Sequence, residues 1–324
     1  MKKGMLLGFA CAALAACGVA APSAKWVPAE ADFVVAIQGQ PDRERDVVRA
    51  WRTALGEAGV TEGPFLTDNQ KSGSPLTAVS PLDIRSDGKF ERFLTAFLGA
   101  KDNLGIYPAQ SITLSWCLPE KMPEAQGTDF DPTLFGEAYC IIENPAFDPE
   151  AAIACIDELA QGVGTVERVP QGDWQIVRPT AKAKAEQPNA PDVLGGWRPI
   201  PGGVVCVLGD AFAKADALLA GKAPSAAGDA SVERLCAPAQ YTMFRFLARD
   251  VKGLLKQFVT DPETAMQLDM SVGWLRTVSD FWVQIGVNET KAITLDIVAK
   301  AEDEESAAMV RDTFIAYKMM VGGL

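Results

Sequence analysis

The sequence contains no histidine among its 324 residues. Histidine is the usual general base of serine and cysteine hydrolases and the commonest metal ligand in proteins. Its absence excludes Ser-His-Asp and Cys-His catalytic systems and every metal site that needs an imidazole. Catalysis by a pair of carboxylates, as in glycoside hydrolysis, is the enzymatic chemistry that this composition still allows.

Basic residues are also scarce, with 30 lysines and arginines against 42 aspartates and glutamates and a net charge of −12. A nucleic-acid surface needs Lys and Arg gathered in one place to neutralise phosphates. The basic residues here are spread along the chain, so we expect no nucleic-acid partner. The glycines of a dinucleotide fingerprint or a P-loop are missing too. We therefore assign no cofactor, no metal ligand and no catalytic residue.

No apolar run reaches the roughly 18–20 residues that a membrane-spanning helix needs. The nearest approach follows Lys2 and Lys3 and extends from Gly4 to Ala16. A helix of this length covers only about 20 Å, whereas the hydrocarbon core of a bilayer is about 30 Å thick. A basic start followed by a short apolar run is typical of an export signal.

The end of this run, Leu14-Ala15-Ala16-Cys17, resembles the lipobox of bacterial lipoproteins. The resemblance implies a signal peptide at residues 1–16 and a lipid on the thiol of Cys17, which becomes the mature N-terminus in the cell envelope. Gly18 stands where Asp marks inner-membrane retention in such families, which favours the outer membrane, on its periplasmic face or at the surface. The alternative is plain secretion with a cut beyond Cys17, but Pro22 lies close to the candidate sites.

Strands and amphipathic helices alternate along the rest of the chain. Apolar residues of period two predict strands at residues 33–37, 112–118, 138–142, 204–208, 241–247, 281–287 and 293–299. Helical periodicity predicts helices at residues 41–59, 149–159, 210–221, 251–258, 262–277 and 303–321. This pattern predicts an α+β fold in which helices pack on a mostly antiparallel sheet.

The same unit, a strand followed by an acidic helix start and a helix, occurs near residue 148 and again near residue 303. We therefore predict two similar α+β halves, with a chance match of a generic unit as the alternative. The predicted parts are a signal peptide, a tether, a first half, a linker or long loop and a second half, at residues 1–16, 17–28, 29–180, 181–196 and 197–324. The arrangement resembles uncharacterised exported bacterial proteins with paired α+β repeats, a family without a specifying motif, so this resemblance carries no function.

The clearest unit is a hairpin near the end of the chain, at residues 281–299. Phe281, Val283 and Ile285 alternate along its first strand, and we expect them to face the core. Trp282 lies on the other face of this strand. The pattern leaves open whether its side chain is exposed or packs under a helix.

Five of the seven cysteines lie beyond the signal region. None forms a C-x-x-C pair, which argues against zinc ribbons and thioredoxin-like redox chemistry. An odd number leaves at least one thiol free or paired between chains. Cys117 and Cys140 lie near the ends of consecutive predicted strands, so we name them as the candidate disulfide, ahead of Cys206 and Cys236. Free cysteines buried in the core are the alternative.

These observations predict a lipid-anchored cell-envelope protein with a non-catalytic binding or structural role. Its partners would be the membrane, through the lipid, and an unknown ligand such as an envelope protein or a glycan. The alternative is a carboxylate-dependent hydrolase acting on envelope or environmental glycans. Two carboxylates about 5–10 Å apart in a deep cleft with tryptophan walls would favour the hydrolase.

Overall fold

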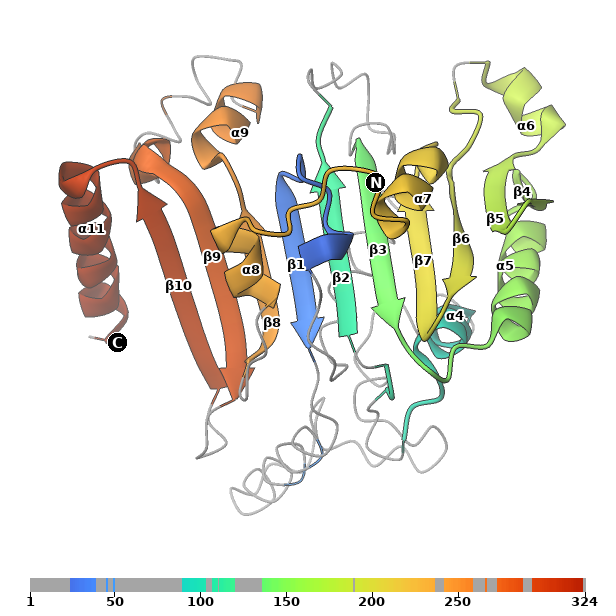
Figure 1. The fold of residues 1–324 in the computed structure, drawn as a ribbon, viewed down its shortest axis with the longest axis horizontal. Coiled ribbons are helices and arrows are strands. Elements are labelled where there is room, and N and C mark those ends of the chain that lie inside the picture. Colours follow the sequence, from blue (N-terminus) through green and yellow to red (C-terminus); the bar gives the residue numbers. More distant parts are fainter. Residues whose placement is uncertain are drawn as a thin grey trace.

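One antiparallel sheet of ten strands extends through the computed structural model (Figure 1), in the order β10-β9-β8-β1-β2-β3-β7-β6-β5-β4. The structure describes residues 24–38, 45, 49, 89–102, 107–109, 111–119, 136–188, 190–236, 242–258, 266, 273–287 and 293–322. The strands are β1 (Phe33–Gln38), β2 (Ser111–Cys117), β3 (Glu137–Glu143), β4 (Val166–Gln171), β5 (Trp174–Pro179), β6 (Gly195–Ile200), β7 (Gly203–Leu208), β8 (Thr242–Ala248), β9 (Val278–Val287) and β10 (Ile293–Ala301).

Helices pack on this sheet, which confirms the predicted α+β class. The described helical segments are η2 (Ala24–Trp26), α4 (Lys89–Leu98), α5 (Pro149–Val163), α6 (Ala181–Glu186), α7 (Phe212–Leu219), α8 (Ala230–Cys236), α9 (Val251–Phe258), η4 (Gly273–Thr277) and α11 (Glu304–Gly322). Of the helix predicted at 41–59, only residues 45 and 49 are described, and both are helical. The helix predicted at 262–277 lies mostly outside the described residues and ends in η4. None of the described helices is long and apolar enough to cross a bilayer.

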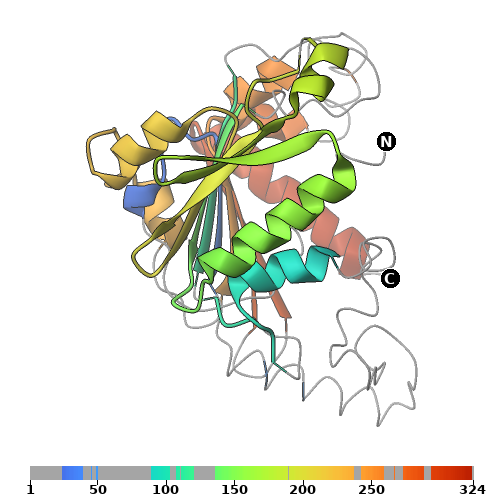
Figure 2. The same ribbon diagram turned by 90° about the vertical axis from the view of Figure 1, so that its right-hand side faces the viewer.

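The sheet has two covered faces, which Figure 2 shows on opposite sides of the strands. We call the face under η2, α7 and α8 the N-terminal face; Val34 and Ala36 of β1 point into its core. We call the face under α4 and α5 the α5 face; Val35 and Ile37 point into its core. Helices on both faces explain why the central strands are apolar on both sides rather than alternating.

Three strands were not predicted from the sequence, namely β4, β5 and β6. Charged residues and prolines interrupt the apolar alternation there, as in the segment Val166–Gln171. Proline fits at these positions because β4 is an edge strand. In β6, Pro199 lies beyond the last residue that pairs with β5, which is Trp197. The segment 181–196, predicted as a linker or long loop, contains the short helix α6 and connects the neighbouring strands β5 and β6.

The C-terminal hairpin, β9 and β10, has its buried and exposed faces arranged differently from the prediction. Trp282 is only 5% exposed and packs under α8 on the N-terminal face. On the α5 face, where we expected the core, Ile285 and Ile297 are 39% and 40% exposed. Among the described residues, those of α9, α11 and η4 that pack on this face lie at the other end of the hairpin, around Phe281. The expectation that the whole apolar row is buried is therefore wrong.

Candidate functional site

The first described residues form an N-terminal strap, residues 24–32, that lies on the N-terminal face before β1. Ala24 is 4% exposed and Val27 is fully buried. The strap pairs with the segment after α7, because Ala226 N donates to Val27 O at 2.8 Å and Ala29 N donates to Pro224 O at 3.3 Å. The last residues of the predicted tether, 24–28, therefore belong to the packed body, while Cys17 lies outside the described residues.

Arg249, directly after β8, holds the strap by its guanidinium group. Its Nη1 donates to Ala29 O at 2.8 Å and to Ala31 O at 3.0 Å, and its Nη2 pairs with Asp229 at 2.8 Å. These bonds satisfy two carbonyl groups of the strap. They connect the start of the described chain to residues more than 200 positions later.

Lys214 of α7 makes a second attachment between the strap and the sheet. Its ammonium group pairs with Glu30 of the strap and with Glu137 of β3, at 2.6 Å from Glu137 Oε2. The Tyr139 hydroxyl also donates to Glu137 Oε2, at 2.8 Å. Burial alone would raise the pKa of Glu137, but the bonds from Lys214 and Tyr139 outweigh it and hold this pKa below its usual value.

Two carboxylates, Glu30 and Glu137, come together in this cluster, so it bears on the predicted alternative of a hydrolase. General acid–base catalysis needs one carboxyl group protonated and the other ionised. Here Glu30 and Glu137 share one ammonium group, which favours the charged form of Glu137. Burial and the bond to Glu137 raise the pKa of Tyr139, so the phenol stays neutral. The cluster is therefore suited to holding the strap rather than to proton transfer.

We predict that Glu137→Gln makes stability less sensitive to acid. The folded-state pKa of Glu137 is lowered, so its contribution is complete above the unfolded-state pKa of about 4.3 and is lost as the pH falls through the folded-state value. The difference in unfolding free energy between wild type and variant should be largest near neutral pH and shrink below about pH 4. Urea unfolding at several pH values measures it. A difference that does not change with pH would show that the pKa of Glu137 is not lowered in the folded protein.

The structure contradicts the predicted pairing of Cys117 with Cys140. Cys117 lies opposite Glu137 and Cys140 lies opposite Leu114 in the ladder between β2 and β3. Successive side chains point to opposite faces of a sheet, and the two cysteines belong to the cores of different faces. Neither cysteine is part of a disulfide in this structure. Burial, reinforced by the Glu30 carboxylate, raises the pKa of Cys117 to about 12, so this thiol is neutral and a poor nucleophile.

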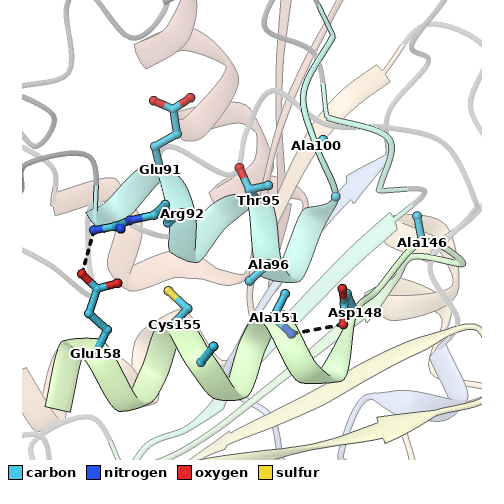
Figure 3. Close-up of a pocket in the computed structure, with 12 residues that line it drawn as sticks. Glu91, Arg92, Thr95, Ala96, Ala100, Ala146, Asp148, Ala151, Cys155 and Glu158 are labelled. Atoms are coloured by element: carbon cyan, nitrogen blue, oxygen red, sulfur yellow. Dashed lines mark hydrogen bonds and ion pairs between the residues drawn. The ribbon is translucent and has the colours of Figure 1, made fainter. Parts of the chain in front are cut away.

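A groove of about 920 Å³ lies between α4 and α5 on the other side of the sheet (Figure 3). Small side chains of both helices, such as Ala96 and Ala151, leave this space open, and Thr95 and Cys155 also line it. The sequence prediction missed the groove because it missed α4. The apolar residues of α4, Phe90, Phe93, Leu94, Phe97 and Leu98, recur with helical spacing and were a usable signal.

The charged groups that line the groove already have partners within the protein. Glu158 pairs with Arg92 at 2.9 Å, and Glu91 pairs with Lys101. Asp148 caps α5 by accepting from two backbone amides of its first turn. The lining contains no tryptophan. The groove therefore lacks the deep, tryptophan-walled carboxylate pair that would favour the hydrolase, and no described group of acidic or cysteine residues has the arrangement of a metal site.

No known protein family matches this chain, and a search of curated proteins finds no match either. Among solved structures, the chain aligns with a crystal structure of a protein named TP0453, over 91% of this chain and 87% of that chain. The sequence identity is 7% and the TM-score is 0.39. A similarity this remote carries no argument about function.

Proposed function

We propose that this protein is a lipid-anchored component of the cell envelope with a non-catalytic binding or structural role, and that the lipid on Cys17 holds it at the outer membrane. The observation that carries the proposal is the order of features at the N-terminus. A basic start, a short apolar run and a lipobox are followed almost at once by the packed N-terminal strap. This is the order that an anchored protein needs.

The distance between the anchor and the body supports this proposal. Only residues 18–23 separate Cys17 from Ala24, and fully extended they reach at most about 25 Å. Ala24 is buried in the core of the N-terminal face. A lipid on Cys17 would therefore keep Ala24 and the N-terminal strap within about 25 Å of the membrane surface.

The described polar groups also support a non-catalytic role. Glu30 and Glu137 at the strap are ion-paired with Lys214, and the carboxylates of the groove are engaged in ion pairs or a helix cap, as described above. Catalytic groups, by contrast, have pKa values matched to proton transfer and are accessible to a substrate. The groove then stands as the candidate surface for an envelope protein or a glycan ligand.

We expect Cys17→Ser to abolish lipidation and to move the protein from the membrane fraction to the soluble fraction, because the thiol is the acceptor of the diacylglyceryl group. Mass spectrometry of detergent-extracted protein should show that the wild-type chain begins at a lipidated Cys17. Cys11→Ser is the matched control, since this cysteine lies within the signal peptide and should leave the mature protein unchanged. A mature N-terminus beyond Cys17, or unchanged fractionation of Cys17→Ser, would refute the anchor.

We also propose that the chain contains two similar halves, built around the antiparallel pair β1 and β8. From β1 the chain continues through α4 to the paired strands β2 and β3 and then to α5; from β8 it continues through α9 to β9 and β10 and then to α11. Both series extend outward in the sheet from the central pair, as an approximate two-fold axis requires. Strands β4–β7 extend the sheet on one side only.

The helix starts provide independent support for this duplication. Asp148 accepts hydrogen bonds from amides in the first turn of α5. Asp303 does the same at α11, where its Oδ1 accepts from Ser306 N at 2.8 Å. An Asp at this position satisfies amides that have no partner within the helix. The two caps occupy equivalent places in the two series of elements.

A further inference from the structure

Two cysteines face each other directly in the middle of the sheet. Strands β3 and β7 are antiparallel neighbours, and their register places Cys140 opposite Cys206. Both side chains lie on the α5 face, partly buried in the same apolar cluster. The sequence places these residues in separate predicted strands and gives no sign that the strands are paired.

The type of this pair sets the distance between the two residues. At the end of the same ladder, Asn144 N donates to Gly202 O at 2.9 Å, which marks a hydrogen-bonded pair. Hydrogen-bonded pairs recur at every second position of an antiparallel ladder, so Cys140 and Cys206 form one as well. The Cα atoms of such a pair are about 5.5 Å apart, within the range of about 4.4–6.8 Å that disulfides span. The Cβ atoms of a hydrogen-bonded pair are also about 5.5 Å apart, so they must approach each other by about 1 Å for the S–S bond to form.

We propose that Cys140 and Cys206 form a disulfide bond when the chain folds in an oxidising compartment. The two thiols lose two protons and two electrons as the S–S bond forms. These reduce the disulfide of an incoming oxidant to two thiols, through a mixed disulfide with one of the cysteines. The oxidant is a small-molecule or protein disulfide, such as glutathione disulfide in vitro. The proposal does not depend on the lipid anchor.

The environment of the pair determines when the bond forms. Burial raises the pKa of Cys206 to about 12, and the thiolate is the form that attacks a disulfide. The folded, reduced protein therefore reacts slowly with an oxidant. The bond forms during folding, while both thiols are still accessible to solvent.

The other three cysteines beyond the signal region have different surroundings. Cys117 and Cys236 lie in the core of the N-terminal face, across the sheet from the proposed bond. Cys155 is on α5 and lines the groove between α4 and α5 (Figure 3). One bond and three free thiols account for the odd number of cysteines.

Peptide mapping after oxidative refolding tests the proposal. The full chain is unfolded and reduced, then refolded in a buffer of oxidised and reduced glutathione, denatured, alkylated without reduction and digested. We expect a peptide pair that joins Cys140 to Cys206, lighter by about 2 Da than the two reduced peptides together, with Cys117, Cys155 and Cys236 alkylated. Alkylation of both Cys140 and Cys206 in the refolded protein, or a bond from either to another cysteine, would overturn the proposal.

Variants provide a second readout. In Cys140→Ser the thiol of Cys206 should become alkylated, whereas the matched variant Cys155→Ser should keep the bond. A reductant should lower the melting temperature of oxidised wild type and of Cys155→Ser by several degrees, since the bond restricts the unfolded chain. It should not change the melting temperature of Cys140→Ser. An equal effect of the reductant on all three proteins would contradict the bond. Cys17→Ser should also keep it, so failure of the anchor and failure of the bond are distinguishable.

Discussion

Trp282→Ala should lower the free energy of unfolding by about 3–5 kcal/mol, the usual cost of removing a buried aromatic side chain. The Trp282 side chain is 5% exposed and lies between β9 and α8, in a cluster that contains Val232 and Leu247. Its Nε1 donates to Ser231 O at 3.4 Å, and the Arg234 guanidinium lies 5.7 Å from its ring centre. The variant removes the aromatic contact between α8 and the C-terminal hairpin and leaves the hydrogen bond from Ser231 Oγ to Asp280 in place.

Ile285→Ala is the matched control, because this residue is on the same strand but on the exposed side. Ile285 is 39% exposed, so its replacement by Ala should lower the free energy of unfolding by about 1 kcal/mol or less. Urea unfolding of both variants gives the comparison. Equal losses would contradict the burial of Trp282 under α8, and a larger loss for Ile285→Ala would mean that the hairpin presents its other face to the core.

Gly203→Ala should destabilise the protein by about 3 kcal/mol, through a steric conflict within the sheet. A Cβ atom at this position would lie 2.0 Å from Ile142 O and 3.1 Å from Glu143 Cα. Both are backbone atoms of β3, which pairs with β7 along its whole length. Neither strand can move away without breaking this pairing.

The neighbouring Gly202→Ala separates the steric conflict from backbone conformation. Gly202 has φ +81° but no atom within 4 Å of a Cβ at that position. Its replacement should lower the free energy of unfolding by only about 1–2 kcal/mol, because a residue with a Cβ atom is strained at positive φ. Unfolding in urea compares the two variants. If Gly202→Ala were as damaging as Gly203→Ala, the close approach of β3 and β7 at this point would be refuted.

Features that depend on neighbouring residues in the sequence were predictable. The Asp148 cap and Pro149 in the first turn of α5 are local chemistry, and the structure confirms both. Alternation of apolar residues also placed β1, β2, β3, β7, β9 and β10 correctly. These signals arise within a few residues and do not depend on the partner element.

Features that depend on which elements meet were not predictable from one sequence. The burial of Trp282 follows from the position of α8, and the groove follows from the packing of α4 against α5. The pairing of β3 with β7 brings Cys140 to Cys206 across the segment that contains β4, β5 and β6. Residue patterns within each strand contain no information on this register, so the prediction chose the cysteines of consecutive strands instead.

The N-terminal strap determines how the protein responds to a pulling force. The strap leads directly into β1, and β1 pairs with β2 on one side and with β8 on the other. Tension applied at the N-terminus acts along the length of this strand and loads both ladders in shear, so their hydrogen bonds must break together rather than one after another. The Lys214 and Arg249 contacts must yield before the load reaches the sheet. The chain therefore enters the fold at a point of high mechanical resistance, in its centre rather than at an edge.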